Sequence, residues 1–324
     1  MTARVLVTGA NGFVGRALVA QLLHCGRRVT AVLRGPVHAS ARECTSSLRT
    51  VQVGELAPVT DWRLALDGVD AVVHCAARVH VMRETAADPM AAFRRVNVDG
   101  TLQLAKQAEA AGVRRFVFIS SIGVNGAETF GAPFTPDDVP APHSAYAQSK
   151  HEAELGLQAL ARESGLEVVI IRPPLVLGPG APGNFDRLMR ALHRGMPLPL
   201  GALHNRRSLV ALGNLVSLIE TCLDHPAGAN QVFLVSDGKD ISTTDLLNGV
   251  AAALGTRARL IRVPAAVLKA VARLTGQAQL AQQLCGSLQV DISKTRGLLG
   301  WAPVVRLDQA LEEAAREFLA RTGN

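Results

Sequence analysis

The sequence predicts an α/β fold built on a doubly wound parallel sheet, with helices covering both faces. Short runs of Val, Ile and Leu alternate with helical patterns through the first half of the chain. Strands that are apolar along their whole length are typical of parallel sheets buried on both faces, and alternation of such strands with helices indicates a Rossmann-type arrangement. A glycine-rich turn directly after the first run supports the same prediction.

The first half of the chain supplies the strands and helices of this sheet. Helices are expected over about 12–26, 93–111 and 146–164. The expected strands are RVLVTGA at 4–10, RVTAVL at 28–33, AVVHCAA at 71–77, RFVFISS at 115–121 and EVVIIRPP at 167–174. Residues 1–173 are therefore predicted to form a dinucleotide-binding Rossmann domain.

From about Pro174 the pattern loosens into segments punctuated by proline and glycine. Short strands are expected at RRSLVAL (206–212) and QVFLVSD (231–237), and helices at about 185–194, 214–224, 243–254, 264–274 and 307–321. We predict that residues 174–324 form a smaller α/β C-terminal lobe that binds substrate, with one segment that could return to the Rossmann sheet.

The composition is that of a compact enzyme-sized protein. The 324 residues are 48% hydrophobic and 19% charged, which is far from the composition of a disordered chain. The formal charge of +7 comes from arginines spread along the chain, and aromatic residues make up only 4%. Nucleic acid is therefore not an expected partner, because it requires clustered positive charge and stacking surfaces.

Cysteine usage and the distribution of apolar residues bear on location. The five cysteines are scattered without a CxxC pair, which favours reduced cytoplasmic thiols and no metal site. The N-terminus shows a strand pattern and no signal peptide pattern. Lys269 and Arg273 interrupt VPAAVLKAVARL at 263–274, the best candidate for a membrane span of about 20 residues. We expect a cytoplasmic protein without a membrane partner.

Three glycines in VTGANGFVG follow the first strand and open the first helix. Gly9 permits a tight turn, Gly12 lets the backbone approach a pyrophosphate, and Gly15 lets the helix pack closely on the sheet. The helix N-terminus adds free N–H groups and a positive dipole. In this context the glycines predict a dinucleotide site.

The end of the second strand bears on which dinucleotide binds. An NAD site usually has Asp or Glu there, about 20 residues past the glycines, to accept the ribose hydroxyls. This sequence has Leu33 followed by Arg34, whose guanidinium could bind a 2′-phosphate. We expect NADP(H) to be preferred. NAD(H) stays open, since Arg34 could also be a solvated surface residue.

Tyr146 and Lys150 form a YxxxK pair at the start of an expected helix, a spacing that places both side chains on one face. Hydride transfer at a carbinol carbon needs a proton exchanged with the oxygen, and a phenol with a pKa of about 10 is poorly suited to this. A nearby ammonium lowers that pKa. Ser121 could hydrogen-bond the same substrate oxygen, with Ser120 as the alternative. We predict that Ser121, Tyr146 and Lys150 are catalytic.

Six segments together carry a family resemblance. They are TGANGFVG at 8–15, HCAA at 74–77, NVDGT at 97–101, FISS at 118–121, YAQSK at 146–150 and RPPLVLGPG at 172–180. In order and spacing they resemble the extended short-chain dehydrogenases/reductases, the group of UDP-galactose 4-epimerase and the nucleotide-sugar dehydratases. The resemblance covers nearly the whole chain. It implies a UDP-linked or other nucleotide-linked sugar as substrate, and a homodimer formed through two helices per subunit.

The resemblance also implies which residues hold the cofactor. His74 to Ala77 would line it, Glu55 would lie near the adenine, and Asn97 would steady the catalytic helix. His74 could instead be a core residue at a strand end, and Asn97 a helix cap. The implied cofactor residues are Gly9, Asn11, Gly12, Phe13, Val14, Gly15, Arg34, Glu55, Leu56, His74, Ala76, Ala77, Lys150 and Pro173.

Substrate contacts are implied in both halves of the chain. Arg207 stands where related epimerases have a phosphate-binding arginine, and a guanidinium suits a diphosphate; Arg206 is the competing candidate. Asn184 stands at a polar contact position, and Arg78 and His80 follow HCAA toward the reacting sugar. We expect His80 to be a structural or substrate-binding residue more than the proton donor.

Departures from the family pattern narrow the reaction. Family dehydratases carry Asp-Glu just after the catalytic hydroxyl residue, where this chain has Ile122 and Gly123, so dehydration is disfavoured. Arg34 favours an exchangeable NADPH and thus a net reductase. The stretches at 77–85 and 205–212 resemble bacterial enzymes that reduce UDP-2-acetamido-2,6-dideoxy-4-hexulose to UDP-N-acetylquinovosamine for surface polysaccharides such as the O-antigen of lipopolysaccharide.

We therefore predict an NADP(H)-dependent reductase of a 4-keto nucleotide sugar. Tyr146 would protonate the forming alkoxide, Ser121 would position that oxygen, and Lys150 would lower the pKa of the tyrosine. Two alternatives stay open. One is a UDP-hexose or UDP-N-acetylhexosamine 4-epimerase with retained NAD, and the other is a catalytically silent NADP-binding regulatory protein on the same fold.

Overall fold

The computed structural model describes residues 3–34, 46–79 and 88–323. Within these residues the main feature is a parallel sheet in the order β3-β2-β1-β4-β5-β6-β9. Its strands are β1 (Arg4–Thr8), β2 (Arg28–Leu33), β3 (Leu48–Gln52), β4 (Ala71–His74), β5 (Arg115–Ile119), β6 (Glu167–Arg172) and β9 (Gln231–Leu234). The direction of strand addition reverses between β1 and β4, which is where open α/β sheets bind their ligands.

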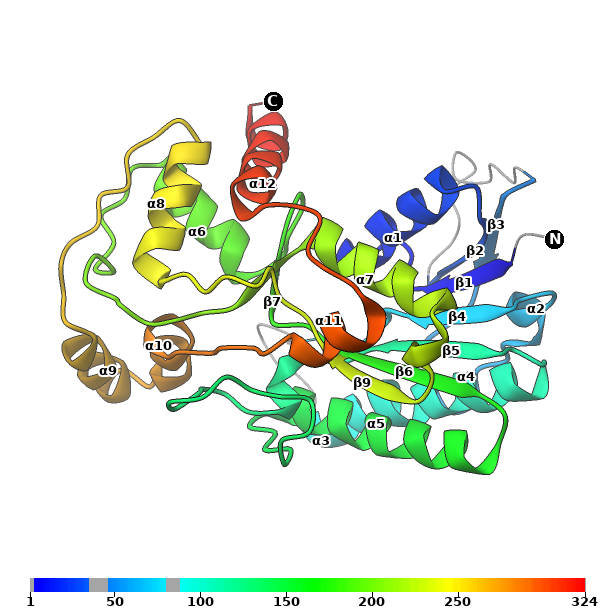
Figure 1. Cartoon of the computed structure of the whole chain (residues 1–324). Coiled ribbons are helices and arrows are strands. Elements are labelled where there is room, and N and C mark those ends of the chain that lie inside the picture. The colour runs from blue at the N-terminus through cyan, green and yellow to red at the C-terminus, as the bar shows by residue number, and fades with distance from the viewer. Residues whose placement is uncertain (1–2, 35–45, 80–87, 324) are drawn as a thin grey trace.

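Helices cover both faces of the sheet (Figure 1). α1 (Phe13–His24) and α7 (Leu212–Asp224) lie on one face, and α4 (Gly100–Ala110) and α5 (Ala145–Glu163) lie on the other. The predicted doubly wound α/β fold is therefore confirmed.

Strand β1 shows how the sequence builds two cores. Val5 and Val7 pack in the core under α1 and α7, whereas Leu6 packs in the core under α4 and α5. All three side chains are fully buried. Successive side chains of a strand point to opposite faces, so a sheet covered on both sides needs an unbroken apolar strand.

The segment before α4 differs from the single helix expected over 93–111. Helix α3 (Pro89–Arg94) begins earlier, where the Asp88 carboxylate accepts a hydrogen bond of 3.0 Å from the amide of Ala91. A π-helical turn, η2 (Arg95–Asp99), then joins α3 to α4. Such turns add one residue to a helix and often occur at functional sites.

A second lobe packs beyond the carboxyl end of the sheet. A short parallel pair, β7 (Leu175–Leu177) and β8 (Leu209–Ala211), leads into it. Its larger helices share a third apolar core. The helices of the lobe are α6 (Asn184–His193), α8 (Thr243–Ala253), α9 (Ala265–Leu274), α10 (Ala278–Cys285) and α12 (Leu307–Thr322). Helices α9 and α10 lie at its outer end, away from the sheet (Figure 1).

Three elements from beyond residue 173 pack with the sheet. They are α7, β9 and α11 (Ser293–Leu299). Strand β9 pairs with β6 and closes one edge of the sheet. These three elements follow residue 173 in the sequence but belong with the sheet, and the rest of the chain after residue 173 forms the second lobe.

Several short elements were not expected from the sequence. One of them is β3, whose one buried side chain is Val51, so the strand carries no apolar run. The others are α2 (Arg63–Leu66), β7, α10, α11 and the 3₁₀ turns η3 (Ile122–Val124) and η4 (Pro226–Gly228). Among the described helices, none is long and apolar enough to cross a membrane.

Candidate active site

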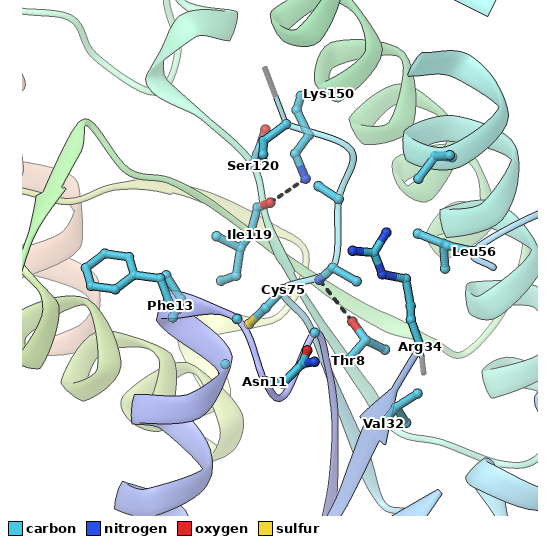
Figure 2. A pocket seen from close by; sticks show the side chains of 18 of the residues that line it. Thr8, Asn11, Phe13, Val32, Arg34, Leu56, Cys75, Ile119, Ser120 and Lys150 are labelled. Carbon is cyan, nitrogen blue, oxygen red and sulfur yellow. Dashed lines mark hydrogen bonds between the residues drawn. The ribbon is translucent and has the colours of Figure 1, made fainter. Parts of the chain in front are cut away.

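The carboxyl ends of the central strands surround a cavity of about 420 Å³. It lies where the strand order reverses, and most of the predicted cofactor residues line it (Figure 2). Those that do are Gly9, Asn11, Gly12, Phe13, Val14, Gly15, Arg34, Leu56, Ala76, Ala77, Lys150 and Pro173. Glu55 and His74 do not. The catalytic candidates Ser121 and Tyr146 line the same cavity.

The glycine turn fits a dinucleotide because backbone packs directly on backbone there. Gly9 has a φ of +63°, and a Cβ at this position would lie 3.0 Å from the amide nitrogen of Ala76. A Cβ at Gly15 would lie 2.1 Å from the carbonyl oxygen of Gly9. Helix α1 begins at Phe13 with Gly12 as its N-cap, and no side chain caps it. The first-turn amides of α1 are thus left for an anion such as a pyrophosphate.

His74 lies beneath the cavity and orients the loop that lines it. Its ring is fully buried between the hydroxyls of Thr8, 2.7 Å from Nδ1, and Thr101, 3.0 Å from Nε2. The Thr8 hydroxyl also accepts a hydrogen bond from the amide of Ala76 (3.1 Å). Burial, assisted by the charge of Lys150, lowers the pKa of His74 to about 3. The predicted direct cofactor contact is wrong for His74, which is a neutral support at the end of β4.

Asn97 links the loop after β4 to the catalytic helix. Its side chain forms two hydrogen bonds with the backbone of Arg78, from the amide of Arg78 at 2.7 Å and to its carbonyl at 3.0 Å. Its Nδ2 also donates to the hydroxyl of Ser149 at 3.0 Å, and this hydroxyl donates to the carbonyl of Tyr146 at 2.7 Å. Asn97 therefore steadies α5, as the resemblance implied, and the π-helical turn is what aims it there.

Tyr146 is the second residue of α5 and lies one helical turn before Lys150. Its ring meets the ring of Phe93 edge-on, with centroids 6.2 Å apart. Burial raises the pKa of Tyr146 to about 12. The predicted lowering of this pKa by Lys150 is therefore wrong for the structure as it stands, because desolvation of the phenolate dominates.

Lys150 reaches the carboxyl end of β5. Its Nζ donates to the main-chain oxygen of Ile119 at 2.7 Å (Figure 2). The same atom lies 4.3 Å from the centre of the Phe118 ring. Burial lowers the pKa of Lys150 to about 8, an effect that Cys75 and Glu154 partly offset. The side chain is thus cationic below that pH and is held at the floor of the cavity.

The two adjacent serines after β5 have different surroundings. Ser120 is buried and donates its hydroxyl proton to the carboxylate of Glu154. Ser121 is partly exposed, and its Oγ accepts a hydrogen bond of 3.1 Å from the amide of Gly123. The hydroxyl proton of Ser121 can therefore be given to a substrate oxygen, which favours Ser121 over Ser120.

An ion pair lies behind these serines. Glu154 on α5 and Arg172 at the end of β6 are both buried and form a bidentate pair, with bonds of 3.0 Å and 2.6 Å. Arg172 also donates to the side-chain oxygen of Asn125 at 2.9 Å. The pair joins the catalytic helix, the turn after β5 and the end of β6, and neither residue was singled out from the sequence. A signal existed, since Glu154 is one helical turn past Lys150.

The end of the cavity near β2 contains Arg34. This residue is exposed, and Figure 2 shows its side chain turned toward the cavity from the end of the strand. Glu55 does not line the cavity, and its main-chain oxygen accepts a hydrogen bond of 2.7 Å from Thr60. Leu56 and Trp62 form this wall instead, because their side chains turn inward and are buried. The position of Glu55 beside the adenine stays a prediction, and its neighbours Gly54 and Leu56 line the cavity.

The residues predicted for the sugar nucleotide are not gathered at this cavity. Arg78, Asn184 and Arg207 do not line it, and His80 lies outside the described residues. Asn184 donates to the side chain of Gln283 at 3.3 Å.

Arg207 is partly buried and donates to the carbonyl of Gly286 at 3.1 Å. Burial lowers the pKa of Arg207 and the charge of Glu128 opposes this shift; Arg206 is exposed.

Cys75 lines the cavity, as expected of the segment from His74 to Ala77. Four other lining residues were not singled out from the sequence: Thr8, Val32, Trp62 and Ile119. Three of these lie at or next to the carboxyl ends of strands. That position is itself a signal in a doubly wound sheet, whereas Trp62 follows an irregular loop and had none.

Comparison with known proteins places this arrangement in a family. The pattern of the NAD dependent epimerase/dehydratase family matches residues 5–236. The chain belongs to this family. A UDP-glucose 4-epimerase of Vibrio cholerae is 45% identical over 321 residues, covering 98% of this chain and 96% of its own. An Escherichia coli O157:H7 epimerase that is described as acting on N-acetyl-alpha-D-glucosaminyl-diphospho-ditrans,octacis-undecaprenol is 25% identical over 98% of this chain and 96% of its own.

Two solved structures agree with the fold. MoeE5, solved with UDP-glucose and NAD, superposes with a TM-score of 0.78 at 27% identity, covering 99% of this chain and all of that one. UDP-glucuronic acid 4-epimerase from Bacillus cereus, solved with NAD, has a TM-score of 0.79 at 21% identity and covers 98% of this chain and 99% of its own. The family expected from the sequence motifs is confirmed, and the chain is an enzyme of this family.

Proposed function

We propose that this enzyme is a 4-epimerase of a UDP-hexose or UDP-N-acetylhexosamine that keeps NAD bound through catalysis. The observation that carries the proposal is the meeting of Ser121, Tyr146 and Lys150 with the glycine turn at one cavity. The 45% identity to an epimerase across almost the whole chain supports this reaction over the net reduction that we favoured from the sequence alone.

The residues of the chain fit the roles that epimerization requires. The glycine turn and the loop after β4 would hold NAD, which would supply a hydride acceptor and donor for carbon 4 of the sugar. Tyr146 takes the proton of the 4-hydroxyl and later returns it, and Ser121 holds the same oxygen. Lys150 is cationic below about pH 8. When its ammonium leaves the carbonyl oxygen of Ile119 and approaches Tyr146, its charge favours the phenolate of that tyrosine.

The turn after β5 supports epimerization over dehydration. Ile122 and Gly123 are buried in η3, and a Cβ at Gly123 would lie 3.3 Å from the Cβ of Ala147. Neither residue has a titratable group. Elimination of water across two carbons needs a further acid and base, and this turn offers neither.

A net 4-keto reductase is the second candidate, and Arg34 favours it. The exposed guanidinium lines the cavity at the end of β2, where a 2′-phosphate would be recognised. In this second reading NADP(H) is the cofactor and is released after each turnover. A silent regulatory protein would not need the three catalytic groups together.

We also propose that the enzyme is cytoplasmic and homodimeric, and that Arg207 and Asn184 contact the sugar nucleotide.

The experiment that tests the function needs no added cofactor. Purified enzyme is denatured and the released dinucleotide identified, and intact enzyme is incubated with UDP-glucose and UDP-N-acetylglucosamine while the sugars are followed by NMR. We expect NAD and conversion at carbon 4 of at least one sugar. Consumption of NADPH with a UDP-2-acetamido-2,6-dideoxy-4-hexulose, without such conversion, would establish the reductase instead.

A further inference from the structure

We propose that the outer end of the second lobe docks on an anionic lipid surface. This region, called the basic tip, comprises residues 257–280 and includes α9. The inference concerns a surface remote from the cavity and does not depend on the proposed function. It also revises the expectation that the protein has no membrane partner, because an interfacial contact needs no membrane-spanning segment.

Helix α9 presents an apolar face that nothing in the described structure covers. None of its residues is buried. Val267 is 50% exposed, Val271 52% and Leu274 89%. These positions are spaced i, i+4 and i+7, so the side chains form one stripe along the helix. Ile261, 54% exposed just before the helix, adds to the apolar surface.

The helix is held by a different side. Leu268 packs against the apolar core of the second lobe, and Lys269 lies 3.8 Å from the carboxylate of Glu128. The exposed stripe is therefore displayed by a fixed helix. Figure 1 shows α9 at the end of the lobe that lies farthest from the sheet.

The charged side chains of the segment that contains the stripe are all basic, and Glu128 of another segment lies beside Lys269. The sequence from 246 to 290 contains no Asp or Glu and five basic residues. They are Arg257, Arg259, Arg262, Lys269 and Arg273. The four arginines are exposed and have no ion pair to a carboxylate within the described part of the chain. An apolar stripe with flanking cations suits a surface that accepts apolar side chains and carries negative headgroups.

A second copy of this chain suits the basic tip less well. A symmetric contact brings the same surface of both copies together, so the arginines of one copy would face a surface that carries the same arginines. A lipid surface carries negative headgroups throughout, so it can accept Arg273 on α9 together with the three arginines that precede the helix. Because the stripe is short, the docking is expected to be reversible and weakened by salt.

The test uses the full-length enzyme and vesicles. Sedimentation is compared for vesicles of phosphatidylcholine alone and of phosphatidylcholine with phosphatidylglycerol, at low and at high salt. We expect binding to the vesicles that contain phosphatidylglycerol at low salt, and its loss at high salt. Failure to bind these vesicles at low salt would overturn the proposal. Polyglutamate serves as a probe for acidic proteins. Binding to polyglutamate but not to the vesicles would also overturn the proposal, because an acidic protein would then be the partner.

Variants localise the contact. The double change Val267→Ser and Leu274→Ser should abolish sedimentation with these vesicles, and Arg262→Gln should weaken the partition coefficient about fivefold. The controls are Val304→Ser, at another exposed apolar residue, and Arg316→Gln, at another exposed arginine. Both should bind like the parent enzyme.

Two further results would overturn the proposal. One is an equal loss of vesicle binding in the controls and in the basic-tip variants. The other is a fall in molar mass by light scattering in the double variant, which would make the stripe a contact between copies. Turnover of a soluble UDP-sugar should be unchanged in all variants, so a failure of vesicle binding says nothing against the proposed reaction.

Discussion

The carboxylate of Glu154 binds the guanidinium of Arg172 through two hydrogen bonds in the interior of the protein. Glu154 lies one helical turn past Lys150, and Arg172 directly precedes Pro173, which lines the cavity. The pair therefore fastens the helix that carries the catalytic residues to the strand that ends beside them.

Breaking this pair should be far more costly than breaking a surface pair. Glu154→Ala leaves Arg172 buried without its counter-ion, and the free energy of unfolding should fall by about 3–5 kcal/mol. Glu152→Ala, which removes a partly exposed carboxylate of α5 that pairs with the exposed Arg94 of α3, should cost less than about 1 kcal/mol. Denaturant unfolding measures both values. Similar losses in the two variants would contradict the structural role of the buried pair.

The catalytic hydroxyls can be separated by substitution. Tyr146→Phe should lower kcat by a factor of about 10²–10⁴ or more while NAD stays bound, because the ring is retained and the proton-transfer group is lost. Ser121→Ala should lower kcat with little change in stability. Ser120→Ala should act chiefly on stability, since its hydroxyl bonds to Glu154. A larger loss of kcat in Ser120→Ala than in Ser121→Ala would reverse the assignment.

Acid should destabilise the protein partly through His74. Burial lowers the pKa of His74 to about 3, whereas the unfolded chain takes up its proton near pH 6.5. The unfolded state thus binds more protons between these values, so this contribution to stability is full above pH 6.5 and is lost as the pH falls toward 3. In His74→Gln the unfolding free energy should decline less steeply over this range. Parallel pH profiles for the two proteins would show that His74 is not buried in its neutral form.

Substitution of Arg34 tests how the cavity distinguishes the two dinucleotides. If the side chain recognises a 2′-phosphate, Arg34→Glu should weaken binding of NADPH at least tenfold and leave binding of NADH nearly unchanged or improved. Fluorescence titration of enzyme freed of its dinucleotide measures both affinities. Equal changes for the two ligands would mean that Arg34 is a solvated surface residue, and would remove the main support for a reductase.

Sequence patterns predicted the sheet well because its central strands must be apolar along their whole length, as Val5, Leu6 and Val7 show. They predicted the glycine turn and the YxxxK helix for a related reason, since those chemical roles fix residue types at fixed spacing. Edge strand β3, with Val51 as its one buried side chain, gave no comparable pattern.

The contacts of polar side chains were harder to predict. The motif HCAA indicated a loop beside the cofactor, but only the tertiary structure shows that His74 is held between Thr8 and Thr101 below it. Likewise, the pairing of Glu154 with Arg172 depends on where α5 crosses β6. The pKa of Tyr146 depends on burial, which the spacing to Lys150 does not reveal.

The return of the same hydrogen to carbon 4 distinguishes epimerization with retained NAD from net reduction by NADPH. UDP-glucose that carries deuterium at carbon 4 is incubated with the enzyme in ordinary water, without added dinucleotide, and the product is examined by NMR and mass spectrometry. We expect UDP-galactose, or the matching epimer of the N-acetylated sugar when that substrate is used, with the deuterium still at carbon 4. A product that has exchanged its deuterium for solvent hydrogen, or turnover that occurs only as net consumption of NADPH, would contradict it.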